Sequence, residues 1–325
     1  MADMTAVTGP RRPSRAAELV CFADVSVDLL VRVARLPRPD DKLSAALIGE
    51  FGGGMGANVA AAFARLGGRA RLVSSVGDDE RGRRSVDELR RLGVDVECTV
   101  VGGSGTFWTI ALIDERGEKS LIEFPGPASS PPWGRIDWGA LDGAVMAYTV
   151  GAEGRSAGEL FDECRRRGVR TALDLESADL GDAEMVASLL RRADVLFAPA
   201  SIAQAVTGVA VEEAPRALLA AGPSLVVVTQ GRRGCLLGTR EGGVVAVPGH
   251  DVRVADTTGA GDCFAGAFLW ALVRGWPPDD CARLATLMAA QSVTAYGSRG
   301  RLLRLEELAS LPAAAELPID RGREG

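Results

Sequence analysis

Short apolar runs alternate along the chain with longer stretches in which apolar residues recur every three or four positions. The short runs predict strands at residues 19–25, 71–76, 145–150, 170–175, 194–198 and 225–229. The longer stretches predict helices, such as the one over residues 59–66, which Gly67 and Gly68 end. Regular alternation of this kind is typical of a doubly wound, mostly parallel sheet with helices on both faces.

Two stretches interrupt the alternation and predict antiparallel β structure at one edge of the sheet. Residues 106–113 and 119–124 flank Asp114-Glu115-Arg116-Gly117, a hairpin turn in which Gly supplies a positive φ. Residues 32–51 supply further strands. We therefore expect a small sheet beside the α/β body, with segments at about 32–52 and 104–126. This sheet is either a lid that excludes water from a reacting phosphate or a purely structural edge hairpin.

Size, charge and cysteine content narrow the class of protein. A chain of 325 residues with 47% hydrophobic content can bury a large core. We expect one domain over residues 18–313, a disordered N-terminal tail at residues 1–17 and a C-terminal tail at residues 314–325. The net charge of −6, without a Lys/Arg-rich segment, argues against a nucleic-acid partner. We find no signal peptide and no membrane span, and the six cysteines form no CxxC pair. These features predict a soluble cytoplasmic protein with reduced thiols.

The strongest chemical signal is the segment Asp256-Thr257-Thr258-Gly259-Ala260-Gly261-Asp262, which opens a helix near Cys263. Its small residues allow the backbone to approach a phosphate closely, and the helix start offers free N–H groups and a positive dipole end. Asp262 could then act as general base toward an incoming hydroxyl. Taken alone, Asp262 could equally be an ordinary helix N-cap.

This segment resembles the DTxGAGD signature of the PfkB, or ribokinase-like, carbohydrate kinases. A second segment, Gly52-Gly53-Gly54-Met55-Gly56-Ala57-Asn58, resembles the N-terminal GGxxAN signature of the same family. The resemblance covers roughly residues 19–300. It implies a ribokinase-like three-layer α/β/α fold with a small β-sheet lid, ATP as phosphoryl donor and Mg²⁺ as cofactor, and a homodimer formed through the lid.

The resemblance also implies a role for individual residues. Asp262 would be the base, beside a phosphate site formed by Gly259, Ala260 and Gly261. The sugar would be bound by Asp28, Gly53, Gly54 and Asn58. A monovalent cation, K⁺, would be held by Asp256 and Thr258. Residues 226–235 resemble the family's VTxGxxG loop, although a generic strand and turn is an alternative. The nucleotide would be bound by Thr229, Gly231, Arg233, Gly234 and Thr286.

The chain departs from the family pattern at the NxxE motif, because residues 198–204 contain neither Asn nor Glu. Asp174 and Glu176 could help to hold Mg²⁺ through water, or they could simply be a solvated strand end. We expect ATP-dependent phosphorylation of a monosaccharide or sugar acid, as in ribokinases, fructokinases, ketodeoxygluconate kinases or sulfofructose-type enzymes. A nucleoside kinase and a catalytically weak sugar-binding regulatory protein are the alternatives.

Overall fold

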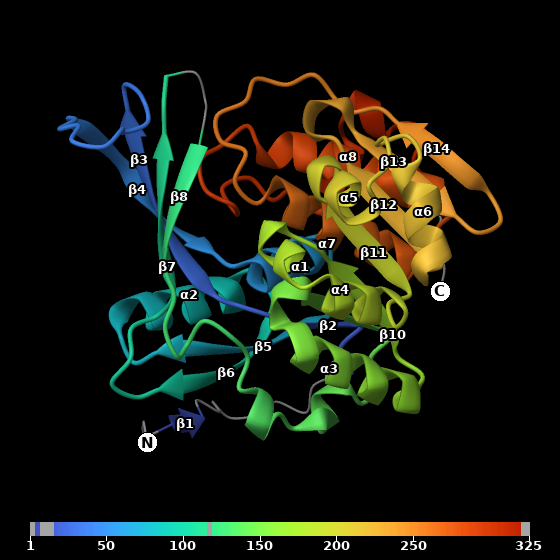
Figure 1. Ribbon diagram of the computed structural model, residues 1–325, viewed down its shortest axis with the longest axis horizontal. Coiled ribbons are helices and arrows are strands. Elements are labelled where there is room, and N and C mark those ends of the chain that lie inside the picture. Colours follow the sequence, from blue (N-terminus) through green and yellow to red (C-terminus); the bar gives the residue numbers. More distant parts are fainter. Residues whose placement is uncertain (1–3, 7–15, 116–118, 320–325) are drawn as a thin grey trace.

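The computed structural model describes residues 4–6, 16–115 and 119–319 and contains two sheets (Figure 1). The larger sheet has ten strands in the described residues, in the order β1-β6-β5-β2-β9-β10-β11-β12-β13-β14. Its strands are β1 (Met4–Ala6), β6 (Asp95–Val101), β5 (Ala70–Gly77), β2 (Leu19–Phe22), β9 (Met146–Val150), β10 (Arg170–Asp174), β11 (Val195–Pro199), β12 (Leu225–Thr229), β13 (Cys235–Thr239) and β14 (Gly243–Val247). The strands from β6 to β12 pair in parallel, and the others pair antiparallel at the two edges.

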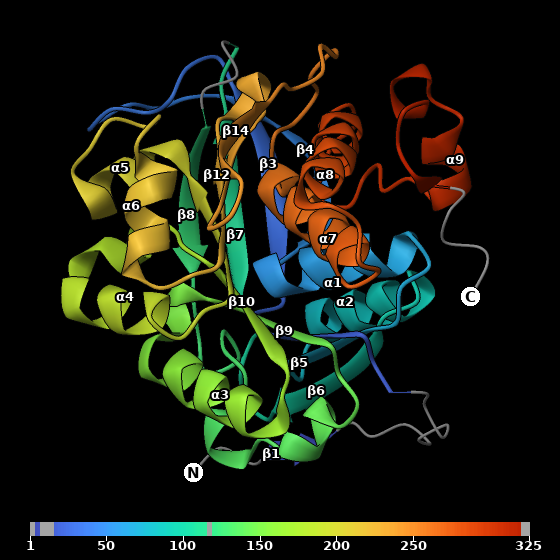
Figure 2. The same ribbon diagram turned by 90° about the vertical axis from the view of Figure 1, so that its right-hand side faces the viewer.

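Helices cover both faces of this sheet, as the edge-on view in Figure 2 shows. One face packs on α1 (Met55–Arg65), α2 (Glu80–Arg91), α7 (Ala260–Leu272) and α8 (Pro278–Ser292). The other packs on α3 (Gly154–Arg167), α4 (Ala183–Leu190), α5 (Ala200–Thr207) and α6 (Ala214–Ala221). Because side chains alternate along a strand, β2 sends Leu19 and Cys21 into the first core and Val20 and Phe22 into the second. The predicted three-layer α/β/α fold is confirmed.

The smaller sheet, which we call the lid sheet, stands to the left of the body in Figure 1. Its strands lie in the order β4 (Ala45–Gly53), β3 (Ser26–Val33), β7 (Trp108–Ile113) and β8 (Lys119–Phe124). The strand predicted at residues 19–25 ends earlier, at Phe22, and Asp28 therefore lies inside β3 of the lid sheet and not at the end of a body strand. The chain turns between the two strands, where the Asp24 carboxylate accepts a hydrogen bond from the Met55 amide. Residues 116–118 of the predicted hairpin turn lie outside the described residues.

Part of each segment predicted as a tail lies among the described residues. Residues 4–6 form β1, which pairs with β6. At the other end, α9 (Leu305–Ala309) is followed by a short 3-10 helix, Pro312–Ala314, and both Ala314 and Ile319 are buried in the core. No helix in the described part of the chain is long and apolar enough to cross a membrane.

Candidate active site

Residues 256–262, which we call the phosphate turn, lead directly into α7. Gly259 caps the helix with a φ of 73°, and a Cβ there would lie 2.4 Å from Cβ of Ser298. Both the positive φ and the close contact with Ser298 therefore require glycine at this position. Gly261 differs, because a Cβ built on it meets nothing within 4 Å. The first turn of α7 thus faces open space at Gly261, where an anion can approach the positive end of the helix dipole.

Asp262 lies in this first turn and is 8% exposed. One of its oxygens accepts a hydrogen bond of 2.7 Å from the side-chain amide of Asn58, in the first turn of α1. The two helices approach closely because Gly266 has no side chain: a Cβ there would lie 2.6 Å from the Val59 carbonyl oxygen. Helix packing therefore joins the two signature segments, which are 204 positions apart along the chain.

The lid sheet supplies the opposite wall. Asp28 of β3, Thr109 of β7 and Glu123 of β8 occupy neighbouring register positions and form a row across three strands. The Thr109 hydroxyl donates to one oxygen of Asp28, and the Ser298 hydroxyl donates to the other at 3.4 Å. A Cβ on Gly53 would lie 2.5 Å from the Asp28 carboxylate, so this glycine allows the lid strand to bring Asp28 into the site.

These groups surround a pocket of about 580 Å³, which we call the acceptor pocket. Seven residues of the predicted sugar and phosphate sites line it: Asp28, Gly54, Asn58, Gly259, Ala260, Gly261 and Asp262. Gly53 is not a lining residue; its carbonyl oxygen instead accepts a hydrogen bond from Arg299. The structure thus brings the three separate sequence segments of the predicted sugar and phosphate sites to one pocket.

Further carboxylates, not predicted from sequence, line the same pocket: Asp24, Glu123 and Glu153. Asp174, the last residue of β10, and Glu176, two residues after it, also line it. Burial, with repulsion from Asp262, raises the pKa of Asp24 to about 7 and that of Glu176 to about 8. Asp24 and Glu153 share one signal that sequence reasoning could have used. Asp24 lies near the carboxyl end of the strand predicted at residues 19–25, Glu153 comes shortly after the strand predicted at residues 145–150, and α/β sheets bind ligands at these strand ends.

A second pocket of about 560 Å³, the nucleotide pocket, lies on the other side of the phosphate turn. Its wall includes four predicted nucleotide-binding residues: Thr229, Gly231, Gly234 and Thr286. Arg233 is not a lining residue, whereas its neighbour Arg232 is. The two pockets share Thr229, Thr257, Ala260 and Gly261, so the phosphate turn forms the boundary between them.

Asp256 connects the phosphate turn to the loop that follows α8. One carboxylate oxygen accepts hydrogen bonds from the amide and hydroxyl of Thr258, at 2.9 and 2.7 Å. The other oxygen accepts from the amide of Gly297 at 2.9 Å. Asp256 and Thr258, predicted as monovalent-cation ligands, therefore lie together at a structural junction. Within the described residues, no group of three or more His, Cys, Asp or Glu side chains is arranged to hold a metal ion.

Comparisons with known proteins agree with this geometry. The family described as "pfkB family carbohydrate kinase" matches residues 16–303. An ATP-dependent ribose-1-phosphate kinase of Halopiger xanaduensis is 32% identical over 250 residues, which cover 75% of this chain and 81% of that protein. The ribokinase of Mus musculus is 26% identical over 97% of this chain and 99% of its own length. The crystal structure of a ribokinase from Thermotoga maritima superposes with a TM-score of 0.71 at 25% identity, covering 95% of this chain and 100% of that chain.

Proposed function

The chain belongs to the pfkB family of carbohydrate kinases and is an ATP-dependent kinase, and from this premise we propose that its acceptor is a hydroxyl group of a monosaccharide bound in the acceptor pocket. One observation carries the proposal. The phosphate turn separates two pockets of similar volume, one with Asp262 and hydrogen-bonding side chains and one with the glycine-rich loop after β12. A phosphoryl group at Gly261 would be accessible from both pockets.

In this arrangement each residue has a defined task. Asp28 and Asn58 orient the sugar. Asp262 accepts the proton of the attacking hydroxyl group while the hydroxyl oxygen forms a bond to the γ-phosphorus. The bond from that phosphorus to the bridging oxygen breaks, and ADP leaves with the electron pair. The N–H groups at the start of α7 stabilise the charge on the transferred phosphoryl group.

The lining of the nucleotide pocket supports ATP as its ligand. Gly261 leaves open the space that a phosphate needs, and Phe264, Ala290 and Val293 provide an apolar wall for the base. Mg²⁺ bound with the nucleotide would neutralise phosphate charge. Asp174 and Glu176 are the carboxylates that would reach such an ion through water, in place of the missing NxxE motif.

The test is ADP release with purified protein, ATP and Mg²⁺ over ribose, fructose, glucose, adenosine and cytidine. We expect turnover with a monosaccharide. In Asp262→Asn, kcat should fall by about 10³-fold or more while ATP affinity stays within about threefold, because the variant keeps the shape of the turn but loses the base. Asp279→Asn, an exposed position in α8, is the control. Retained turnover in Asp262→Asn would refute the assignment.

A nucleoside is the second candidate acceptor, because Phe107 and Leu121 add apolar surface to the wall of the acceptor pocket. These side chains could pack against a base attached to ribose. Phosphorylation of adenosine or cytidine with a kcat/KM at least tenfold above that of free ribose would favour this alternative.

We propose K⁺ dependence from the placement of Asp256 and Thr258 beside the phosphate turn. A bound cation there would add positive charge near the developing phosphoryl charge. Replacing Na⁺ by K⁺ in the assay should raise kcat, and equal rates in the two salts would remove this part of the proposal.

We also propose that two copies of the chain associate through their lid sheets. Leu47, Ile122 and Phe124 of the lid sheet expose 68%, 46% and 40% of their surface, and such apolar side chains are commonly covered by a partner. Light scattering should give twice the mass of 33.9 kDa, and Ile122→Glu should halve it. A monomer at micromolar concentration would contradict the proposal. A cytoplasmic location stays a prediction.

A further inference from the structure

The acceptor pocket has an unbalanced charge. Seven carboxylates line it: Asp24, Asp28, Glu123, Glu153, Asp174, Glu176 and Asp262. Among the described lining residues there is no Lys, Arg or His. The carboxylates belong to the lid sheet, to the end of β10, to the segments that follow β2, β9 and β10, and to α7. A ligand in this pocket therefore meets carboxyl groups on several sides, and no base among the described lining residues balances them.

The nucleotide pocket has a different charge. Its lining residues include Arg232 and His250 and one carboxylate, Asp251. Two arginines on segments that contribute to the acceptor pocket already have partners within the protein. Arg299 is bonded to Gly53 and Asn58, and Arg32, farther along β3, donates to the Tyr296 hydroxyl. The nucleotide pocket, which we expect to bind an anion, therefore has basic side chains in its wall. The described wall of the acceptor pocket has none.

The carboxylates of the acceptor pocket also interact unfavourably with one another. The pKa of Asp24 rises through burial, then through repulsion by Asp262 and Glu153. A carboxylate or phosphate on the ligand would add a negative charge close to these carboxyl groups, which costs free energy.

We propose that the acceptor is a sugar without an anionic group, and that the lining carboxylates exclude sugar acids and sugar phosphates. The inference rests on the proposed function and narrows it, because sugar acids belong to the substrate range expected from sequence. It also separates this chain from its relative in Halopiger xanaduensis, whose name specifies ribose 1-phosphate. Hydroxyl groups satisfy carboxylate oxygens as hydrogen-bond donors without adding charge.

The experiment compares matched pairs of acceptors: ribose with ribose 1-phosphate, and glucose with gluconate. The best uncharged sugar should have a kcat/KM at least about 100-fold above its anionic partner, since like-charge contacts cost several kcal/mol. An anionic partner that is phosphorylated equally well or better overturns the inference and leaves the kinase function intact. If no compound is phosphorylated, the proposed function fails, and calorimetric binding of the same pairs to the protein decides the charge preference separately.

Charge reversal provides a second readout. Glu123 lies on an exposed lid position beside Thr109, so Glu123→Arg should fold and reduce the repulsion of an anion. We expect the ratio of anionic to neutral kcat/KM to rise about tenfold, whereas Glu241→Arg, in the exposed turn between β13 and β14, should leave it unchanged. An unchanged ratio in Glu123→Arg would contradict a role for the lining charge.

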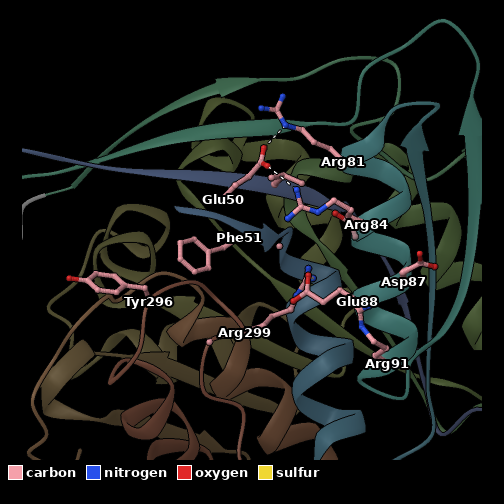
Figure 3. A pocket seen from close by; sticks show the side chains of 13 residues that line it. Glu50, Phe51, Arg81, Arg84, Asp87, Glu88, Arg91, Tyr296 and Arg299 are labelled. Carbon is pink, nitrogen blue, oxygen red and sulfur yellow. Dashed lines mark hydrogen bonds and ion pairs between the residues drawn. The ribbon is translucent and has the colours of Figure 1, made fainter. Parts of the chain in front are cut away.

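A separate observation concerns Arg299, which borders a groove of about 680 Å³ between α2, β4 and the loop after α8 (Figure 3). Its side chain is only 2% exposed. The guanidinium donates to the Asn58 side-chain oxygen at 2.8 Å, donates to the Gly53 carbonyl, and pairs with Glu88 of α2 at 3.3 Å. A buried cation therefore touches the residue that bonds the predicted base.

The contact between Arg299 and Asn58 determines how the side-chain amide of Asn58 is oriented. Asn58 has one acceptor oxygen and one donor NH₂ group. Because Arg299 donates to the oxygen, the NH₂ group points toward Asp262, to which it donates at 2.7 Å. With Arg299 absent, the amide could rotate and present its oxygen to a carboxylate. We infer that Arg299 is a positioning residue that holds Asn58 in the orientation needed to stabilise the ionised form of Asp262.

Charged groups from several elements surround Arg299 and Asn58. Glu88 approaches from α2, Asp28 from β3, Asp24 from the segment after β2 and Asp262 from α7, and all four interact favourably with the Arg299 cation. In Arg299→Met we expect kcat/KM to fall by about 10- to 100-fold, with its acidic limb moved to higher pH because Asp262 loses an oriented donor. Arg299→Lys should retain part of the activity because it keeps the charge.

A double-mutant cycle distinguishes positioning from general destabilisation. If Arg299 acts through Asn58, Arg299→Met should cause little further loss in an Asn58→Ala background. Equal losses in the two backgrounds, or an unchanged pH profile, would overturn the inference. Should Arg299→Met fold poorly because Glu88 loses its partner, the Arg299→Met/Glu88→Gln pair removes both charges and permits the same cycle against Glu88→Gln.

Discussion

The glycines of the phosphate turn are required for different reasons. Gly259 has a left-handed backbone and lies against Ser298, so a side chain there would strain the fold itself. Gly261 has neither restriction within the protein, because its side-chain direction faces open space. The two glycines look equivalent in the sequence. The fold explains why residue 259 is glycine, whereas a ligand that approaches residue 261 would explain the glycine there.

Gly261→Ala tests this distinction. The added methyl group should leave Tm unchanged or slightly higher, because alanine favours helix over glycine by up to about 1 kcal/mol. It should raise the KM for ATP by about tenfold or more, because it occupies the space proposed for a phosphate. Thermal unfolding and initial-rate kinetics measure the two effects, with Gly134→Ala as a control at a position that also has open space. A normal KM for ATP would show that no phosphate approaches Gly261.

At the scale of elements, one side chain of α2 connects the lid sheet to the body. Arg81 pairs with Glu50 of β4 at 2.7 Å (Figure 3) and lies over the Trp108 ring of β7, 4.5 Å from its centroid. Trp108 in turn stacks on Phe124 of β8, with ring centroids 4.0 Å apart. Arg81 of the body therefore contacts β4 and β7 directly and is connected to β8 through the Trp108 ring.

Arg81→Ala should loosen the lid sheet and raise the KM for the acceptor by about three- to tenfold, since a partly exposed ion pair and a cation–π contact are each worth about 0.5–1 kcal/mol. The KM for ATP should change less, because the nucleotide pocket is lined by the body. Arg83→Ala is a matched control on the same helix, where Arg83 pairs with Glu80 and not with the lid. Equal effects of the two variants on the acceptor KM would contradict a specific role for Arg81.

At the scale of the whole molecule, the carboxylates gathered at one end of the sheet should make stability depend on pH. The pKa of Asp24, near 7, and that of Glu176, near 8, lie above the ordinary values of 3.8 and 4.5. Between these limits the folded protein binds more protons than the unfolded chain. The associated stability is therefore fully present below about pH 4 and is lost as the pH rises through 7 to 8.

We expect Tm of the ligand-free protein to fall between pH 6 and 8.5, with a shallower slope in Asp24→Asn. The asparagine oxygen can still accept the hydrogen bond from Met55, so the variant removes the charge and keeps the contact. Asp279→Asn, which is exposed, serves as control. An identical slope in wild type and Asp24→Asn would show that Asp24 is not a source of the pH dependence.

The sequence pattern predicted the body of the fold well where strands are buried on both faces. The run at residues 225–229 coincides with β12, and the helix expected at residues 59–66 is part of α1. The pattern was less informative near the lid. Apart from Asp24, residues 19–25 are apolar, but the chain leaves the main sheet after Phe22. One polar residue in such a run does not by itself distinguish a change of sheet from a continuing strand.

The sequence by itself determined the class of chemistry, because a glycine-rich turn ending in Asp262 and a glycine-rich segment ending in Asn58 are local features whose residue types carry their function. Only the tertiary structure decided the charge of the acceptor pocket and the contact of Arg299 with Asn58. The reason is physical: a pocket's charge is a sum over side chains from β3, β8, α7 and three strand ends, and a sum of that kind exists only once folding has brought the distant segments together.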